Sequence, residues 1–320
     1  MTLNLKKKNF TIIIPTYNRQ NKIKRHLDIF NLENWKKLIN CKPNIIIADD
    51  FPGGKLKEMC EIYKSKLKFF NLIYISRQKN LGQGINLFKT IQEKVDDSYI
   101  WSVGDDDILI PDQSIDFINK ILKYSPDVAV CEFRQGKDNE MGTFFEGKSR
   151  IVNEIDEGLE LIQRFGKLTS LVFKKPKNRF IKVMENKIIG CMYEDRPLAV
   201  ISYLTSNEPR LYLKTELTAK GDKDFGLLKY SMRVFTNLSK CMNLTIEYCS
   251  KLKKKKFPLI KNSNIFDEYK WWKIGIYSTM RGANIRYTRM RFIKEVFIFP
   301  LVIYRVLFNN LNKPNIKWIH

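Results

Sequence analysis

The stretch Tyr99-Ile100-Trp101-Ser102-Val103-Gly104-Asp105-Asp106-Asp107-Ile108-Leu109 is an apolar segment that runs directly into three consecutive carboxylates. Neighbouring carboxylates repel one another and raise one another's pKa unless a cation or water compensates their charge. Mg²⁺ and Mn²⁺ suit this spacing, because they take oxygen ligands and bind one or two carboxylates together with a substrate diphosphate. We therefore predict that Asp105 and Asp107 are metal ligands; the alternative is a solvated acidic turn after a strand.

The whole chain is strongly basic. It has 320 residues, of which 44% are hydrophobic, and a formal net charge of +23. The hydrophobic content is ordinary for a folded protein, whereas the charge points to polyanionic partners: nucleic acid, an anionic membrane or phosphorylated substrates. The six cysteines have neither Cys-x-x-Cys spacing nor His partners. This pattern argues against a zinc site or a disulfide scaffold and fits a reducing cytoplasm.

We expect neither an export signal nor a membrane-spanning helix. The apolar run at residues 10–15 follows a basic N-terminus but is too short for the core of a signal peptide. The apolar run at residues 296–304 is interrupted by Pro300. Its length is about half of what a membrane-spanning helix needs.

Short β-branched runs alternate with amphipathic segments in the first half of the chain. We expect strands at residues 10–14, 44–48, 72–75, 99–103 and 128–133, and helices at residues 21–38, 56–67, 84–95 and 113–124. This alternation predicts an α/β fold with a mainly parallel, doubly wound sheet. Ligands bind beyond the carboxyl ends of the strands in such sheets. The turns after residues 14, 48 and 103 should therefore share one edge.

Those turns carry recognisable motifs. Residues 15–19 read Pro-Thr-Tyr-Asn-Arg, Asp49-Asp50 follows the second strand, Asn80-Leu81-Gly82 precedes a helix, and Gly104-Asp105-Asp106-Asp107 follows the fourth strand. In this combination and order, the motifs resemble those of the inverting glycosyltransferases of family 2. The resemblance covers about the first 110 residues. It implies the nucleotide-sugar-binding GT-A fold, a Rossmann-like, mainly parallel sheet flanked by helices.

The resemblance implies a nucleotide-sugar donor, with a UDP-sugar expected, and Mg²⁺ or Mn²⁺ as cofactor. Residues 15–17 would frame the base, Asp49 or Asp50 would accept hydrogen bonds from the base or ribose, and Arg77 and Lys79 would approach the diphosphate. The donor-binding residues that it implies are Pro15, Thr16, Tyr17, Asn18, Arg19, Asp49, Asp50, Arg77, Lys79, Asn80, Gly82, Asp105 and Asp106. The alternatives are an ordinary strand-ending turn, a helix N-cap at the acidic pair, and solvated basic side chains.

Two features depart from the family pattern. Residues 51–54 read Phe-Pro-Gly-Gly where the family has a small Gly-Ser or Asn-Ser turn, so we expect the pocket to differ locally. The Gln-x-x-Arg-Trp motif of processive members is absent from the sequence. Its absence favours the transfer of one sugar per encounter.

An inverting transfer also needs a general base that takes the proton of the acceptor hydroxyl. Glu194-Asp195 opens an apolar stretch at residues 198–204 and resembles the family's Glu-Asp motif, whose Asp is the base. The resemblance therefore assigns the base to Asp195 and makes Glu194 its helper or the alternative base. The competing interpretation is acidic capping of a helix N-terminus, which the helix macrodipole favours.

Composition changes in the last third of the chain. We assign residues 1–215 to the glycosyltransferase domain, with a donor half at 1–135 and an acceptor half at 136–215, and residues 216–320 to a basic, helical extension. A helix is expected at residues 221–256, and an interfacial segment at 281–308, where basic residues precede an apolar, aromatic run. By analogy with the family, we expect a lipid-linked glycan acceptor of bacterial surface-glycan synthesis and a cytoplasmic protein, peripheral on the inner face of the cytoplasmic membrane. A C-terminal helix packed on the body is the alternative.

Three other functions compete with glycosyl transfer. The first is a P-loop NTPase or kinase, because residues 142–149 match the P-loop pattern. A phosphate loop should leave a strand directly and open a helix, however, and the surrounding sequence predicts neither. A nucleic-acid-binding protein would explain the charge, yet no RNA-recognition, zinc-finger or KH signature is present, so nucleic acid is not an expected partner. The third alternative is a non-catalytic relative of these glycosyltransferases that only binds sugar nucleotides. We expect His26 to be solvated on a basic helix.

Overall fold

The computed structural model describes residues 9–96, 98–135, 141–143, 145, 147–163, 168–188, 195–221 and 232–259. Two compact units divide the chain. Unit 1 comprises Met1–Phe225 and Lys240–Ile260, and unit 2 comprises Gly226–Ser239 and Lys261–His320. The sheet, the helices between residues 20 and 205 and every site residue discussed below belong to unit 1, whereas the helix Met232–Lys253 begins in unit 2 and ends in unit 1.

A mainly parallel sheet of ten described strands forms the centre of unit 1. The strands are β1 (Asn9–Thr16), β2 (Asn44–Asp49), β3 (Asn71–Ser76), β4 (Ser98–Ser102), β5 (Asp107–Leu109), β6 (Val128–Gln135), β7 (Met141–Thr143), β8 (Arg150–Val152), β9 (Leu171–Lys174) and β10 (Leu211–Gly221). Their order along the sheet is β3-β2-β1-β4-β9-β6-β10-β5, with β7 paired to β6 and β8 to β10. Strands β1, β2, β3, β4, β6 and β10 run in one direction, and β5, β7, β8 and β9 run against their neighbours.

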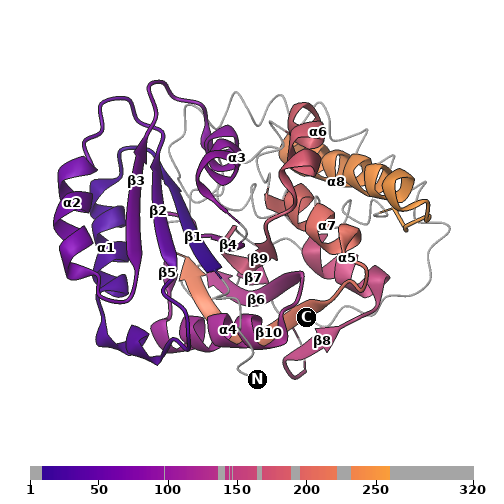
Figure 1. Ribbon diagram of the computed structural model, residues 1–320, viewed down its shortest axis with the longest axis horizontal. Coiled ribbons are helices and arrows are strands. Elements are labelled where there is room, and N and C mark those ends of the chain that lie inside the picture. Colours follow the sequence, from indigo (N-terminus) through magenta and orange to yellow (C-terminus); the bar gives the residue numbers. More distant parts are fainter. Residues whose placement is uncertain are drawn as a thin grey trace, which may run out of the picture. The chain divides into compact units, whose positions relative to one another are not determined.

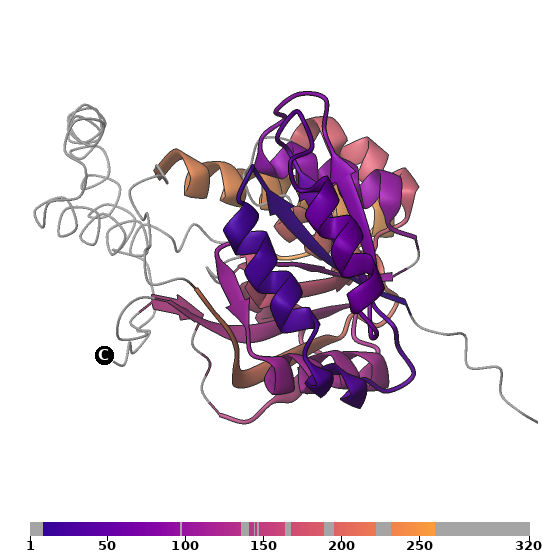
Figure 2. The same cartoon turned by 90° about the vertical axis from the view of Figure 1, so that its left-hand side faces the viewer.

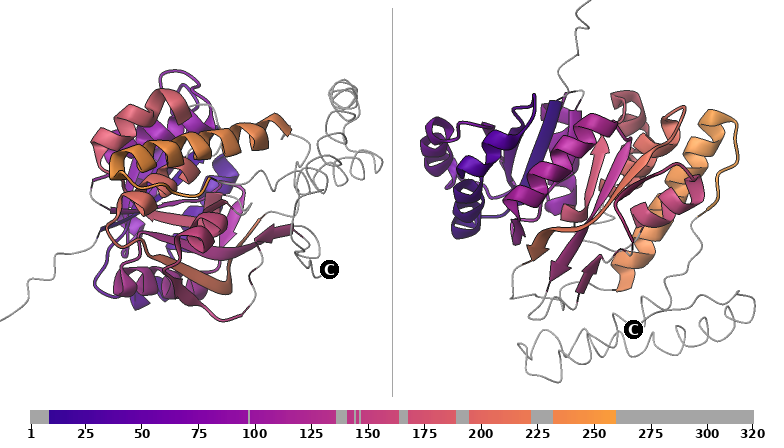
Figure 3. Two further views of the ribbon diagram at one scale, coloured as in Figure 1. Left: turned by 90° about the vertical axis from the view of Figure 1, so that its right-hand side faces the viewer. Right: turned by 90° about the horizontal axis from the view of Figure 1, so that it is seen from below.

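Helices cover both faces of this sheet. They are α1 (Gln20–Phe30), α2 (Lys57–Lys66), α3 (Gln83–Lys94), α4 (Pro111–Tyr124), α5 (Ile155–Gln163), α6 (Asn178–Ile188), α7 (Asp195–Thr205) and α8 (Met232–Lys253), with short 3₁₀ helices η1 (Glu33–Lys37) and η2 (Leu168–Ser170). α1, α2 and α4 pack on one face, and α3 and α7 pack on the other (Figure 1). α1 and α2 lie side by side (Figure 2), and α4 crosses in front of the strands when the molecule is seen from below (Figure 3). The predicted α/β fold with a mainly parallel sheet is confirmed.

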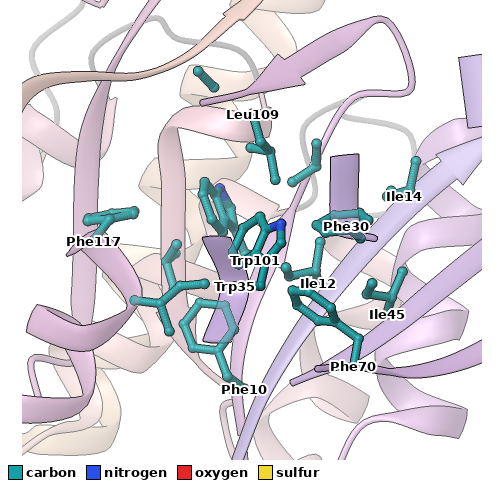
Figure 4. Packing of buried hydrophobic residues seen from close by; sticks show 14 of the residues in the cluster. Phe10, Ile12, Ile14, Phe30, Trp35, Ile45, Phe70, Trp101, Leu109 and Phe117 are labelled. Atoms are coloured by element: carbon teal, nitrogen blue, oxygen red, sulfur yellow. The ribbon is translucent and has the colours of Figure 1, made fainter. Parts of the chain in front are cut away.

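The core under α1, α2 and α4 explains why these segments fold together. Alternate residues of β1, Ile12 and Ile14, point into it, together with Trp101 of β4 (Figure 4). Trp35 and Phe70 pack edge to face, with ring centroids 4.9 Å apart. Burial of each such large side chain stabilises the fold by about 1.5–3 kcal/mol. The packing holds the carboxyl ends of β1, β2 and β4 in fixed register.

One local prediction is wrong, and one strand was not predicted. The single helix expected at residues 21–38 ends at Phe30 and is followed by η1. The chain turns there because the Trp35 indole is buried and donates a hydrogen bond to the Ile29 carbonyl over 2.9 Å. β5 was not expected, since a three-residue strand that begins with an aspartate exists only through its pairing with β10.

The second half adds strands and helices to the same sheet. β9 inserts antiparallel between β4 and β6, and β10 continues the parallel set beside β6. The expected helix at residues 221–256 is wrong at its start, because Gly221 ends β10, and the described helix α8 begins at Met232. The domain boundary at residue 215 lies inside β10, and the division into domains stays a prediction. The interfacial segment expected at residues 281–308 lies outside the described residues. No described helix is long and apolar enough to cross a membrane.

Candidate functional site

The predicted turns meet at one edge of the sheet. Thr16 of β1 pairs with Asp49 of β2, and Ile13 of β1 pairs with Ser102 of β4. The acidic segment at residues 105–107 follows β4, so it lies beside the end of β1. As predicted from the alternation of strands and helices, the carboxyl ends of these strands share one edge.

Asp105 is held by side chains from the β1–α1 connection. Its carboxylate accepts hydrogen bonds from Thr16 Oγ1 at 2.8 Å and from the Arg19 guanidinium at 2.7 Å. Burial raises the pKa of the Asp105 carboxyl, and Arg19 and Thr16 act in the opposite direction. These fixed donors orient the carboxylate before any ligand arrives.

The expectation that His26 is solvated is wrong. Its ring is fully buried, and its Nε2 lies 3.3 Å from the backbone carbonyl of Asp105. Burial lowers the pKa of His26 to about 4, so the ring is neutral at pH 7. Arg25 lies 3.5 Å from the Asp107 carbonyl. Two side chains of α1 therefore contact the backbone of the acidic segment.

Asp107 is fully buried, and its carboxylate accepts a hydrogen bond from the hydroxyl of Thr169. The same hydroxyl accepts the Gly104 backbone N–H over 3.1 Å. A Cβ on Gly104 would lie 2.7 Å from Asp107 Oδ2 and 3.0 Å from Asp106 Oδ1. Only glycine lets these carboxylates fold back over the turn. Asp106 is half-buried between the two predicted metal ligands.

Asp49 and Asp50 organise neighbouring loops. Asp49 Oδ1 accepts the backbone N–H groups of Asn18 and Phe51, and its Oδ2 accepts the Tyr74 hydroxyl. Asp50 accepts the backbone N–H groups of residues 81 and 82. Both carboxylates thus fix the loops that would surround a nucleotide, and a direct contact with base or ribose stays a prediction.

Exposed side chains lie at the end of β1. Tyr17 is 47% exposed, and its ring packs edge to face on Phe51, with centroids 5.3 Å apart. Lys55 Nζ lies 5.5 Å from the centre of the Phe51 ring. Pro15 is buried in β1, whereas Asn18 is exposed and adopts a left-handed conformation with φ of 51°. The Phe-Pro-Gly-Gly turn therefore supplies an aromatic ring beside Tyr17.

Among the predicted diphosphate contacts, Arg77 is bound to α3. Its guanidinium donates to Asn86 Oδ1 at 2.9 Å and Thr90 Oγ1 at 3.0 Å, and it pairs with Glu93. Lys79 is exposed. The Asn80 side chain accepts the N–H of Gly82, which has a φ of 82°. These contacts shape the turn before α3; a role in donor binding stays a prediction for Arg77 and Lys79.

Asp195 differs from the other acidic residues of the site. It is the first residue of α7 and is fully buried, and neither carboxylate oxygen accepts a hydrogen bond from a side chain among the described residues. Arg196 Nε lies 3.9 Å from Asp195 Oδ2. Burial raises the pKa of Asp195 to about 6, and the charge of Arg196 and the backbone N–H groups of Asp195 and Arg196 act in the opposite direction. Glu194 lies outside the described residues.

Sequence comparison identifies the family. The profile described as glycosyl transferase family 2 matches residues 11–183, more than half of the chain. This chain belongs to glycosyl transferase family 2. The resemblance drawn from its motifs is therefore confirmed. No curated protein sequence matches this family 2 glycosyltransferase.

Solved structures show the same fold. The crystal structure of S. aureus TarS matches with a TM-score of 0.53 and 16% identity, covering 74% of this chain and 39% of TarS. The mannosyltransferase PcManGT from Pyrobaculum calidifontis, solved in complex with GDP-Man and Mn²⁺, matches with a TM-score of 0.51 and 10% identity, covering 93% of this chain and 82% of PcManGT. At these identities the likeness concerns the fold. This family 2 glycosyltransferase spans less than half the length of TarS.

The acidic segment of this glycosyltransferase suits a divalent cation that completes its coordination with a diphosphate and water. Asp105 and Asp107 supply hard oxygen donors from one turn, which Mg²⁺ and Mn²⁺ prefer. Among the described residues, no group of three or more His, Cys, Asp or Glu side chains could hold a metal.

The P-loop alternative finds no support in the fold. Residues 142–143 end β7, and Ser149 is followed directly by the strand β8. The Ser149 hydroxyl donates to Glu216 at 2.8 Å. A phosphate loop needs a helix whose N-terminus faces the phosphates, and this segment of the family 2 glycosyltransferase connects two strands instead.

Thr169 and His26 are the site residues that sequence reasoning missed. Thr169 lies 62 positions from the carboxylate that it contacts, and His26 lies 79 positions from the Asp105 carbonyl. No local motif marks either residue. The pairing of β9 with β4 brings η2 beside the acidic segment. A prediction of that pairing would have placed Thr169 at the site.

Proposed function

We propose that this chain transfers a single sugar from a nucleotide-sugar donor, with UDP as the expected carrier, to a hydroxyl group of a glycan acceptor, with inversion at the anomeric carbon. Family membership and the GDP-Man complex of PcManGT support a nucleotide-sugar donor. The observation that carries the proposal is the state of Asp195. A buried carboxyl without side-chain hydrogen-bond donors, with its pKa raised to about 6, can accept a proton near neutral pH.

In the proposed reaction, Asp195 takes the proton of the acceptor hydroxyl while that oxygen attacks the anomeric carbon. The bond from this carbon to the diphosphate oxygen breaks, and the nucleoside diphosphate leaves with the electron pair. Since Asp195 is fully buried, the acceptor reaches it only after the chain that covers it moves. Arg196 stabilises the ionised form before the reaction.

The donor half has a separate task. Asp105 and Asp107 would hold Mg²⁺ or Mn²⁺, which when bound neutralises the charge that develops on the leaving diphosphate. Thr16 and Arg19 orient Asp105 and favour its ionised form against the effect of burial. Tyr17, exposed beside Phe51, would stack on the base.

A thermal-shift panel tests the proposal. The chain is heated with UDP-, GDP-, CDP- and dTDP-sugars, each with Mn²⁺ or with chelator. We expect stabilisation by one nucleotide class that requires the metal, because a ligand that binds the folded state at 100 times its Kd adds about 2.7 kcal/mol. The shift should be lost in Asp107→Asn and kept in the control Asp127→Asn, whose carboxylate pairs with Lys174 away from the site. No shift with any sugar nucleotide would contradict the proposal.

The place of action is a second part of the proposal: the inner face of the cytoplasmic membrane, on a lipid-linked acceptor of bacterial surface-glycan synthesis. The end of α8 supports it. Lys251, Lys254, Lys255 and Lys256 are exposed there. Leu252 and Leu259, 43% and 50% exposed, lie in the same segment. Lysines with exposed leucines suit an anionic lipid surface, where each lysine contributes about 1 kcal/mol.

Vesicle sedimentation tests this surface. We expect binding to phosphatidylglycerol-rich vesicles, weaker binding to phosphatidylcholine vesicles, and a loss of binding when Lys254, Lys255 and Lys256 are all replaced by glutamine. Equal binding to both vesicle types, or unchanged binding by the triple variant, would contradict the membrane proposal. The same variant should keep its nucleotide-sugar shift.

A further inference from the structure

The short helix η2 lies between the two acidic centres of the site. All three of its residues are buried, and it leads directly into β9, between β4 and β6. Its backbone is anchored at Thr169, whose carbonyl accepts the Trp101 indole N–H at 2.8 Å and the Cys131 thiol at 3.5 Å. η2 is therefore fixed to the sheet independently of its side chains.

One end of η2 holds the metal-binding segment. The Thr169 hydroxyl accepts the Gly104 N–H at 3.1 Å and donates to Asp107 Oδ2. Because its oxygen accepts from the backbone, its proton is directed at the carboxylate. This pair of bonds fixes the Asp107 side chain relative to the turn that carries it.

The other end of η2 holds the start of α7. Ser170 Oγ accepts a hydrogen bond from Arg196 at 3.1 Å, and the Ile162 carbonyl accepts a second at 3.0 Å. Arg196 is 2% exposed, and its Nε lies 3.9 Å from Asp195 Oδ2. These acceptors keep the guanidinium beside the predicted base.

We propose that η2 sets the geometry between donor and acceptor chemistry: Thr169 is a positioning residue for Asp107, and Ser170 is a positioning residue for Asp195, through Arg196. The inference rests on the proposed function, because it assumes the two carboxylates to be metal ligand and base. It adds two residues to the proposed site, and their effects can be measured separately. Thr169 acts on binding of the metal and diphosphate, and Ser170 acts on the proton transfer.

The test uses single variants of the full chain. In Thr169→Val the shape is kept, but Gly104 and Asp107 lose their buried partner. We expect the Kd of UDP or GDP with Mn²⁺, measured by calorimetry, to rise roughly tenfold, since residues that support metal ligands typically change affinity by 10- to 100-fold. Binding of the nucleotides with chelator should not change. Thr169→Ser, which keeps the hydroxyl, should bind as the parent chain does.

Ser170→Ala should give the opposite pattern. The Kd of the nucleotide with Mn²⁺ stays within about twofold of the parent, while the kcat for hydrolysis of the sugar nucleotide, the transfer to water, falls roughly tenfold. Thr245→Val is the matched control: its buried hydroxyl bonds only the Cys241 carbonyl of its own helix among the described residues. It should leave both quantities unchanged.

The outcomes separate the two proposals. If the parent chain binds no nucleotide with Mn²⁺, both the proposed function and this inference are overturned. If the parent binds and Thr169→Val binds equally well, or if Ser170→Ala changes the same quantity as Thr169→Val, only the inference is overturned. A Thr169→Val protein that does not fold leaves Thr169→Ser and Ser170→Ala to decide, since a purely structural η2 predicts no split between Kd and kcat.

Discussion

The two acidic centres of the site are both buried but are held in opposite ways. Asp105 is 7% exposed and accepts bonds from a hydroxyl and a guanidinium, whereas Asp195 is fully buried and has no side-chain hydrogen-bond donor among the described residues. Burial raises the pKa of both, but only Asp105 accepts side-chain hydrogen bonds that oppose this effect. The comparison shows that the groups around a carboxylate, and not its residue type, decide its chemistry. A carboxylate oriented by side-chain donors suits metal binding, and one without them suits proton acceptance.

The largest effect should come from removing the unsatisfied carboxylate. Asp195→Asn should lower kcat for sugar transfer roughly 10²- to 10⁴-fold, the usual contribution of a positioned base. Donor binding with Mn²⁺ should not change, because the amide leaves Asp105 and Asp107 untouched. Calorimetry and nucleotide release on the same preparation measure both. Asp195→Asn with full turnover would remove the base from the comparison.

The same substitution should stabilise the fold. The folded-state pKa of Asp195, about 6, lies above the ordinary value of 3.8 for an aspartate side chain, so the folded state binds the proton more tightly than the unfolded state does. Stability therefore falls as pH rises through this window, and at pH 7.5 the ionised carboxyl costs up to about 3 kcal/mol. Asp195→Asn should raise the unfolding midpoint at pH 7.5, and the gain should vanish below about pH 4.

Asp127→Asn is the control for that result. Asp127 is also buried, but it accepts bonds from Lys174 at 2.9 Å and the Arg210 N–H at 3.0 Å. Its replacement should lower the unfolding midpoint, because the asparagine amide keeps only one acceptor oxygen for these two donors and Lys174 loses its counter-charge. A gain in both variants would mean that removing any buried charge stabilises this fold, and the contrast between the two kinds of carboxyl would be lost.

Gly104→Ala tests the satisfied side of the comparison. Its Cβ would come within 2.7 Å of Asp107 Oδ2, so the carboxylate must leave its bond with Thr169 or the turn must shift. We expect the Mn²⁺ concentration for half-maximal activity to rise roughly 10- to 100-fold. A metal titration measures it, and a normal Mn²⁺ requirement would show that the turn adapts without cost to the site.

The comparison also shows which features the sequence could predict. β-branched runs marked β1, β2 and β4, and the motifs at their ends placed Thr16, Asp49 and the acidic segment on one edge. These features are local. β5 was missed because its stability comes from β10, more than 100 positions away. Thr169 was missed because its hydroxyl meets Asp107 only after β9 has joined the sheet.

The position of Asp195 could be predicted from the sequence, but its environment could not. A Glu-Asp pair before an apolar helix marked its place, and α7 begins there as expected. Nothing in the sequence indicates that both oxygens lack side-chain donors, since that property depends on every element packed around them. His26 illustrates the reverse: its basic helix suggested solvent, but the apolar face of α1, with Ile23, Leu27 and Phe30, carries it into the core.

The pH dependence of the reaction should give the smallest effect and the finest test. With the pKa of Asp195 at about 6, kcat/KM should be constant above about pH 7 and fall about tenfold by pH 5, because protonation removes the base. His26 does not contribute in this range, since burial lowers its pKa to about 4. Asp105 is the competing origin, because its pKa is also raised. Binding of the nucleotide with Mn²⁺, measured over the same range, separates them: it stays constant if Asp195 titrates and weakens in parallel with kcat/KM if Asp105 does. A profile that is flat down to pH 5 would mean that Asp195 stays ionised at that pH, and the proposed titration of the base would be wrong.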